Sequence, residues 1–80
     1  KFEKAWLNRG NVLSKMGRHQ EAVEDYTVAI LHYPEYPAAF YNRALAHYKL
    51  KQLNQACNDL KRAELLGQQM EGKIKKEICK

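Results

Sequence analysis

The side chains that could act as metal ligands or nucleophiles in this chain are its three histidines and two cysteines. They are His19, His32, His47, Cys57 and Cys79. Zinc sites draw their ligands from closely spaced pairs, and these residues follow no such spacing. A cysteine–histidine nucleophile pair would need a cleft and an oxyanion-forming loop, and no nearby segment offers one. The sequence therefore predicts no metal site, no cofactor and no enzyme, and His47 is expected to be a packed, hydrogen-bonded histidine.

The two cysteines raise the separate question of a disulfide. Cys57 and Cys79 are expected at similar heights across a hairpin formed by the last two helices, so a bond between them is conceivable. Two cysteines are too few for a disulfide-built scaffold. We expect both to be reduced and to pack as small apolar residues.

Length and charge restrict the remaining classes of function. The chain has 80 residues and a net charge of +5, all of it in residues 37–80 because residues 1–36 sum to zero. The sequence has no apolar run long enough to span a bilayer. It begins at Lys1, so we expect a fragment of a larger protein, with the cytoplasm as the default compartment. Nucleic acid and anionic membrane are considered only for the basic end, at Lys73, Lys75, Lys76 and Lys80.

A shift of the sequence by 34 residues aligns it with itself. Eight residues, Ala5, Asn8, Arg9, Lys15, Ala22, Asp25, Ala29 and Leu31, fall on identical residues, Ala39, Asn42, Arg43, Lys49, Ala56, Asp59, Ala63 and Leu65. Ordinary composition would give about two identities over a comparison of this length. The chain is therefore an internal duplication.

Each copy has the apolar spacing of two helices. Trp6, Gly10 and Leu13 share one helix face, and Ala22 and Tyr26 share another. Breaks are expected at Gly17, Pro34 and Pro37. The expected helices are residues 3–16, 20–33, 37–50, 54–66 and 69–79. Small residues, Gly10 and Ala44 facing Ala22 and Ala56, should let each pair of helices approach closely.

These residues carry a resemblance to a known family. Trp6, Gly10, Leu13, Gly17, Ala22, Tyr26, Ala29 and Pro34 resemble one tetratricopeptide repeat, and Phe40, Ala44, Ala56, Leu60 and Ala63 resemble a second. The resemblance implies an all-α superhelix of tandem antiparallel hairpins in one domain, residues 1–80, with repeat one at 3–36, repeat two at 37–68 and a capping helix at 69–80. The sequence departs from the family pattern at Arg9, Arg43, His47, Lys51 and Gln68. Lys51 replaces the turn glycine, so we expect it to adopt the left-handed conformation at a cost of roughly 1 kcal/mol.

The last expected helix carries an apolar stripe of Met70, Ile74 and Ile78. A repeat array needs a cover at its end that is apolar inside and polar outside. We therefore favour a capping helix over a basic binding helix. The first helix of a further repeat is a third interpretation.

The resemblance also implies a concave groove for an extended peptide or a helix, lined by the first helix of each repeat. The residues of that face are Lys4, Leu7, Asn8, Asn11, Lys15, Tyr41, Asn42, Leu45, Tyr48 and Lys49. Asparagine can pair with a peptide backbone, and lysine favours an acidic partner. The alternative is that Tyr41, Leu45 and Tyr48 only pack between neighbouring first helices.

We expect a non-catalytic module that binds a protein or peptide partner. A structural unit that self-associates through its open repeat ends is the alternative. Co-chaperones of the family hold a C-terminal carboxylate, and Asn11, Asn42 and Lys76 match part of that pattern. Leu7 and Gly72 stand where lysines are expected, so a chaperone-tail clamp is not favoured.

Overall fold

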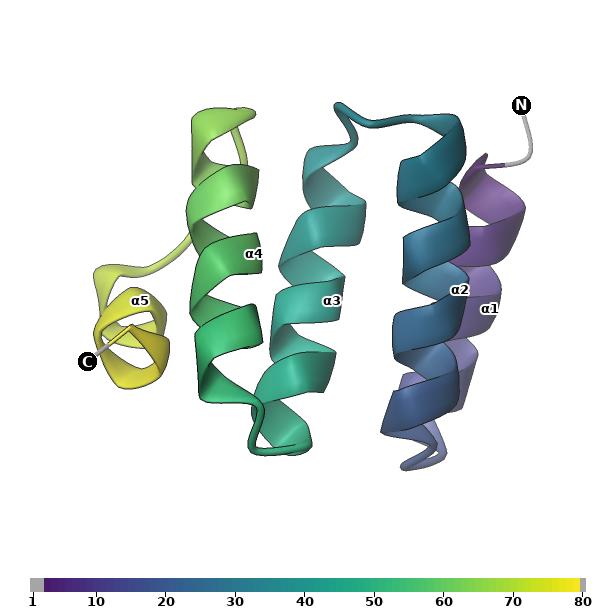
Figure 1. Ribbon diagram of the computed structural model, residues 1–80, viewed down its shortest axis with the longest axis horizontal. Coiled ribbons are helices and arrows are strands. Elements are labelled where there is room, and N and C mark those ends of the chain that lie inside the picture. Colours follow the sequence, from purple (N-terminus) through teal and green to yellow (C-terminus); the bar gives the residue numbers. More distant parts are fainter. Residues whose placement is uncertain (1–2, 80) are drawn as a thin grey trace.

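The computed structural model describes residues 3–79 and contains helices and no strands over that range, which confirms the expected all-α class. Its helices are α1 (Glu3–Lys15), α2 (His19–His32), α3 (Pro37–Lys49), α4 (Leu53–Leu65) and α5 (Gly72–Ile78). They follow one another in a row (Figure 1), with α1 packed on α2, α2 on α3 and α3 on α4. None of these helices combines the length and hydropathy that crossing a bilayer requires.

Three turns of one kind end α1, α3 and α4. Gly17, Lys51 and Gly67 have positive φ values of 81°, 63° and 102°. In each turn the next N–H donates to the carbonyl oxygen five residues earlier, at 2.8 to 2.9 Å, which closes the helix as a Schellman motif does. The left-handed conformation expected of Lys51 is confirmed, and it stands where the other two turns have glycine.

In each hairpin a small residue on the first helix packs with a larger residue on the second. A Cβ atom placed on Gly10 would lie 2.6 Å from a ring carbon of Tyr26. In the second hairpin Ala44 and Leu60 occupy the equivalent positions, and both are buried in one cluster. The sizes of the two residues compensate for each other. Gly10 is smaller than Ala44, and its partner Tyr26 is larger than Leu60. The expected close approach of the helices is therefore matched to Tyr26 in one hairpin and to Leu60 in the other.

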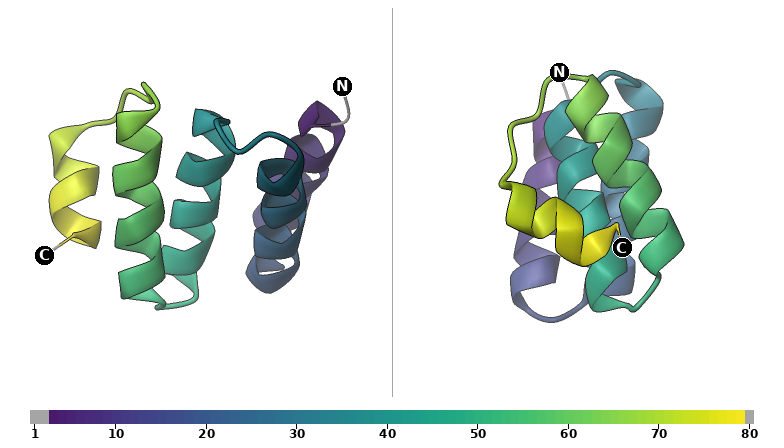
Figure 2. Two further views of the ribbon diagram at one scale, coloured as in Figure 1. Left: turned by 45° about the horizontal axis from the view of Figure 1, so that its top comes forward. Right: turned by 90° about the vertical axis from the view of Figure 1, so that its left-hand side faces the viewer.

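The last helix is shorter than expected. It begins at Gly72, not at residue 69, because Glu71 has an extended backbone with ψ of 140°. Met70, Ile74 and Ile78 contact the buried cluster of the second hairpin, so their apolar stripe faces inward as expected. Lys80, which the sequence places in this segment, lies outside the described residues. Two further views show that α5 runs across the second hairpin and not parallel to it (Figure 2).

The expectation of two reduced cysteines is wrong. A disulfide joins Cys57 to Cys79, whose Cα atoms are 5.0 Å apart. That separation lies within the range that disulfides require. The crossing of α5 over α4 explains the contact, because it brings the end of α5 beside the first half of α4. Helical periodicity alone does not encode this crossing.

Gly10→Ala should destabilise the domain even though alanine favours helices. The added methyl group overlaps the Tyr26 ring, and overpacking of this kind costs roughly 1–3 kcal/mol against a gain of about 1 kcal/mol in helix propensity. We expect a net loss of about 1 kcal/mol in thermal or urea unfolding. Gly72→Ala is the control, because nothing lies within 4 Å of its Cβ position.

Adding Tyr26→Leu to Gly10→Ala recreates the Ala44 and Leu60 pair, so the double variant should lose less stability than the sum of the two single losses. Strictly additive losses would contradict this account.

Lys51→Gly should raise the unfolding midpoint. Glycine adopts a φ of 63° without the steric cost that lysine meets, and relief of that cost should add about 1 kcal/mol. Lys49→Gly is the matched control, because the same substitution inside α3 should lower stability by about 1 kcal/mol. Chemical denaturation of both variants gives the comparison. A Lys51→Gly domain that unfolds earlier than the parent would disprove this interpretation of the turn.

Candidate peptide-binding groove

Ion pairs restrain the rotation of α1 and α3, the first helix of each hairpin. Arg9 on α1 holds Asp25 on α2 through two hydrogen bonds of 2.7 and 2.8 Å. Arg43 on α3 holds Asp59 on α4 in the same way, at 2.7 and 2.8 Å. Both aspartates are buried, with 4% and 7% of their surface exposed. A buried carboxylate needs such a partner, so each pair sets which side of α1 and α3 faces away from the hairpin.

The same arginines also contact the aromatic residues at the start of their helices. The Arg9 guanidinium carbon lies 4.8 Å from the ring centroid of Trp6. The Arg43 carbon lies 5.5 Å from the centroid of Phe40. Cations at these distances are attracted to the ring face. Arg9 and Arg43, at which the sequence departs from the family pattern, thus take part in the packing of their hairpins.

His47 lies on the inner side of α3. Its Nδ1 is 2.6 Å from Oε1 of Gln52, and its Nε2 is 3.7 Å from a carboxylate oxygen of Asp59. This is the packed, hydrogen-bonded histidine that the sequence predicts. Within residues 3–79, no group of three or more His, Cys, Asp or Glu side chains is arranged to hold a metal ion.

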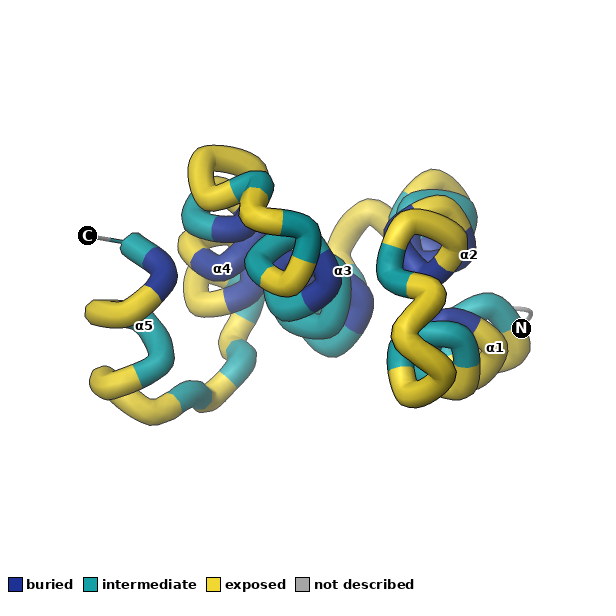
Figure 3. The backbone as a smooth tube through the Cα atoms, turned by 90° about the horizontal axis from the view of Figure 1, so that it is seen from below, coloured by how far each residue is buried: buried dark blue, intermediate teal, exposed yellow. Residues whose placement is uncertain are grey.

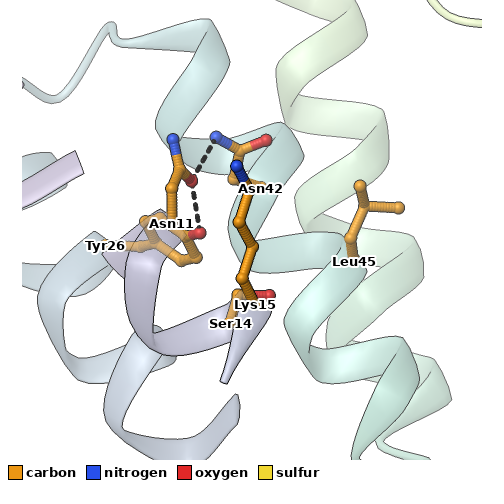
Figure 4. Close-up of a pocket in the computed structure, with 6 residues that line it drawn as sticks. All are labelled: Asn11, Ser14, Lys15, Tyr26, Asn42 and Leu45. Carbon is orange, nitrogen blue, oxygen red and sulfur yellow. Dashed lines mark hydrogen bonds between the residues drawn. The ribbon is translucent and has the colours of Figure 1, made fainter. Parts of the chain in front are cut away.

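Asn11, Tyr26 and Asn42 form a polar cluster between the two hairpins. Oδ1 of Asn11 accepts a hydrogen bond of 2.6 Å from the Tyr26 hydroxyl and one of 3.1 Å from Nδ2 of Asn42. Figure 4 shows the three side chains meeting at this point. Within the described chain, Nδ2 of Asn11 and Oδ1 of Asn42 make no hydrogen bond. One donor group and one acceptor are therefore held in fixed positions. The C=O and N–H groups of an extended peptide could form hydrogen bonds with them.

An open pocket of about 290 Å³ surrounds this cluster. Its other lining residues are Ser14, Lys15 and Leu45, so α1 and α3 both contribute to it. Lys15 is exposed and adds a positive charge, while Leu45 adds apolar surface. The pocket thus combines a hydrogen-bonding centre, a cation and an apolar wall.

The structure distributes the ten predicted groove residues over several places. Asn11, Lys15, Asn42 and Leu45 line the pocket around the polar cluster. Tyr48 and Lys49 line a second hollow of about 400 Å³ that lies beside Glu77.

The other four predicted residues lie apart from these two hollows. Lys4 lies at a hollow of about 180 Å³ near the start of α3. Leu7 packs on the core of the first hairpin, and Tyr41 packs on the cluster beneath α5. Asn8 is exposed on α1.

Two lining residues were missed by the sequence analysis. Ser14 follows Asn11 by three positions on α1, so helical spacing could have identified it. Tyr26 was expected only in the core, and its ring is indeed buried, but its hydroxyl reaches Asn11 at the pocket. No pattern in the sequence signals that second contact.

Burial and charge both act on the Tyr26 hydroxyl. Removal of the ring from water and, to a smaller extent, the negative charge of Asp25 together raise the pKa of Tyr26 to about 12. The hydroxyl therefore keeps its proton over the whole neutral range and remains a donor to Asn11.

The hairpins match a known repeat along most of the chain. Residues 3–36 and residues 38–64 each match the tetratricopeptide repeat. The chain belongs to the tetratricopeptide repeat family. It is also similar to the mitochondrial import receptor subunit TOM34 of Rattus norvegicus, with 42% identity over 50 residues. Those residues are 62% of this chain and 16% of the rat protein, so the chain corresponds to a small part of that relative.

The Tyr26 proton should make stability depend on pH in the alkaline range. The pKa of Tyr26 in the folded state, about 12, lies above the ordinary value of about 10. The folded state therefore binds the Tyr26 proton more tightly than the unfolded state does. The resulting stabilisation is fully present below pH 10 and is lost as the pH rises from 10 to 12. Urea unfolding across that interval should show a steeper loss of stability for the parent than for Tyr26→Phe. Tyr41→Phe is the control for the loss of one phenol group. Parallel slopes for the parent and Tyr26→Phe would contradict the assignment.

Proposed function

We propose that this domain binds an extended peptide of a partner protein in the groove between α1 and α3, without catalysis. Membership of the tetratricopeptide repeat family and the similarity to an import receptor subunit support a protein-binding role. The peptide-binding site is our inference from the polar cluster at the groove.

The observation that carries the proposal is the paired arrangement of Asn11 and Asn42. Their mutual hydrogen bond fixes both amides before any ligand arrives. The unused donor and acceptor can therefore pair with a peptide without further ordering of these side chains, which lowers the entropic cost of binding. Main-chain pairing supplies affinity, while the surrounding side chains supply specificity.

Charge around the groove favours an acidic peptide. Lys15 lines the pocket itself, and Lys49 lies in the next hollow along α3. Positive side chains at the edge of a binding surface raise the association rate of an acidic partner and make it sensitive to salt.

A clamp for a chaperone C-terminus is less well supported. Leu7 packs against the core of the first hairpin, and Gly72 has no side chain to offer. The carboxylate of such a tail would therefore lack two of the cations expected around it. We propose that the domain recognises an acidic segment within the partner's chain and not the partner's C-terminus.

Binding of an acidic peptide can be tested with a displayed library of random 12-residue peptides selected on the 80-residue chain. We expect enriched peptides to carry Asp and Glu. Their affinity, measured by calorimetry, should fall about five- to tenfold with Asn42→Ala, which removes one backbone hydrogen bond. Lys15→Glu should weaken binding and reduce its dependence on salt.

Lys61→Glu is the matched control, because it makes the same charge change at an exposed position of α4 outside the groove. It should leave the affinity close to that of the parent. Equal weakening by Lys15→Glu and Lys61→Glu would mean that the peptide responds only to net charge. Selected peptides that bind the Asn42→Ala variant as tightly as the parent would reject the groove as the site.

A further inference from the structure

Cys57 and Cys79, joined by the disulfide, line an open hollow of about 500 Å³ between α4 and α5. They also line a smaller hollow of about 220 Å³ beside Leu53 and Asn54. Neither cysteine is fully buried. Figure 3 shows α5 beside α4 at one end of the row of helices, with its buried part on the side of α4. The disulfide that joins these helices is therefore within reach of a small molecule in solution.

Three lysines line the larger of these hollows, which we call the basic hollow. They are Lys61 on α4 and Lys75 and Lys76 on α5. Lys61 follows Cys57 by four positions, and Lys75 and Lys76 precede Cys79 by four and three. Cys79 donates its N–H to the carbonyl oxygen of Lys75 at 2.8 Å, so it belongs to the same helical turn. Each cysteine thus has a lysine one turn away on its own helix.

The positive charge of the basic hollow is largely unbalanced. Lys75 contacts a carboxylate oxygen of Glu64 at 2.8 Å. Within residues 3–79, Lys61 and Lys76 form no ion pair. Glu77, two positions before Cys79, lines a different hollow, and no carboxylate is among the described residues that line this one. The basic hollow therefore attracts small anions.

This combination of residues occurs in the second hairpin only. The residues of α2 that correspond to Cys57 and Lys61 in the duplication are Val23 and Thr27. Thr27 accepts a hydrogen bond from Nη1 of Arg43 at 3.1 Å, so the first hairpin uses this position for internal packing. The cysteine and the lysine of α4 are thus additions to the repeat, and they lie in one hollow.

We propose that the basic hollow is a site of thiol–disulfide exchange for a small anionic thiol of the glutathione type. The thiolate of the ligand attacks the sulfur of one cysteine, and a new S–S bond forms while the bond between Cys57 and Cys79 breaks. The electron pair of the broken bond stays on the other cysteine sulfur, which leaves as a thiolate and takes a proton from water. A second ligand thiolate then attacks the ligand sulfur of the mixed disulfide. Two ligand thiols are thereby oxidised to one disulfide, and the protein disulfide is reduced to two thiols.

The lysines act at two points of this exchange. Their charges attract the carboxylates of the incoming thiol, which raises its concentration beside the disulfide. A cation near the departing sulfur also stabilises the thiolate that forms there. Lysines alone would attract any small anion, and the disulfide among them makes a thiol the occupant. The exchange breaks the covalent tie between α4 and α5, and the inference does not depend on peptide binding in the groove.

The rate of disulfide opening in the intact 80-residue chain tests this proposal. The oxidised chain is treated with glutathione or with β-mercaptoethanol, which carries no carboxylate, and acid-stopped samples are analysed by mass spectrometry. The double variant Lys61→Gln with Lys76→Gln should react about fivefold more slowly with glutathione. Its rate with β-mercaptoethanol should fall by less than about twofold, because that thiol has no carboxylate for the lysines to attract. Added salt should reduce the difference between parent and variant.

A matched double variant separates the basic hollow from net charge. Arg62→Gln with Lys73→Gln removes the same charge from exposed positions of the same two helices, outside the lining of the hollow. Its glutathione rate should stay within about twofold of the parent rate. In concentrated urea the parent and the Lys61→Gln, Lys76→Gln variant should react at similar rates, because unfolding removes the hollow. Circular dichroism in buffer verifies that each variant is folded.

Several results would overturn the proposal. Cysteines that stay as free thiols when the chain is incubated with oxidised glutathione would remove the disulfide on which it stands. A disulfide that glutathione does not open in the folded chain would exclude the exchange. Equal slowing by the two double variants would assign the effect to net charge. A glutathione rate that is unchanged by Lys61→Gln with Lys76→Gln would deny the lysines a part in the reaction.

Discussion

Two buried carboxylates, one in each hairpin, determine how the helices of the repeats are held. Asp25 and Asp59 are almost fully removed from water, and a charge in that position is costly unless it is paired. Each is satisfied by both arms of an arginine from the preceding helix. Because two parallel hydrogen bonds fix the direction as well as the distance of the contact, each pair restrains the rotation of α1 or α3 about its axis. The outward sides of these helices, and hence the side chains of α1 and α3 that line the pocket, follow from that constraint.

One residue belongs both to the core and to the pocket between the hairpins. Tyr26 fills the space beside Gly10 with its ring, and its hydroxyl holds Asn11 at the surface. Asn11 in turn holds Asn42 of the next hairpin. A change in packing between α1 and α2 therefore reaches the pair of Asn11 and Asn42 through a single side chain. The second hairpin has Leu60 at the equivalent position, so it has no hydroxyl there that could donate a hydrogen bond as Tyr26 does.

The helices could be predicted because apolar spacing, two prolines and the turn residues all act locally. The duplication also placed Arg and Asp at matching positions in both halves, but identity alone does not say that they pair. The start of α5 and the disulfide were missed because both depend on how that helix crosses α4. The contact between Asn11 and Asn42 likewise joins residues of different hairpins. Tyr41 and Leu7 were assigned to the groove from helical position, while their packing depends on neighbours that spacing does not specify.

The disulfide between Cys57 and Cys79 closes a loop with a sequence separation of 22 residues. In the chain-entropy description, a cross-link of this length restricts the unfolded ensemble by about 3 kcal/mol. The connection before α5 lies largely at the surface, where proteases cut most readily. A cut there would break the backbone without releasing the terminal helix, which would stay attached to α4 through sulfur. The far end of the array is thus retained by a covalent tie that does not run through the main chain.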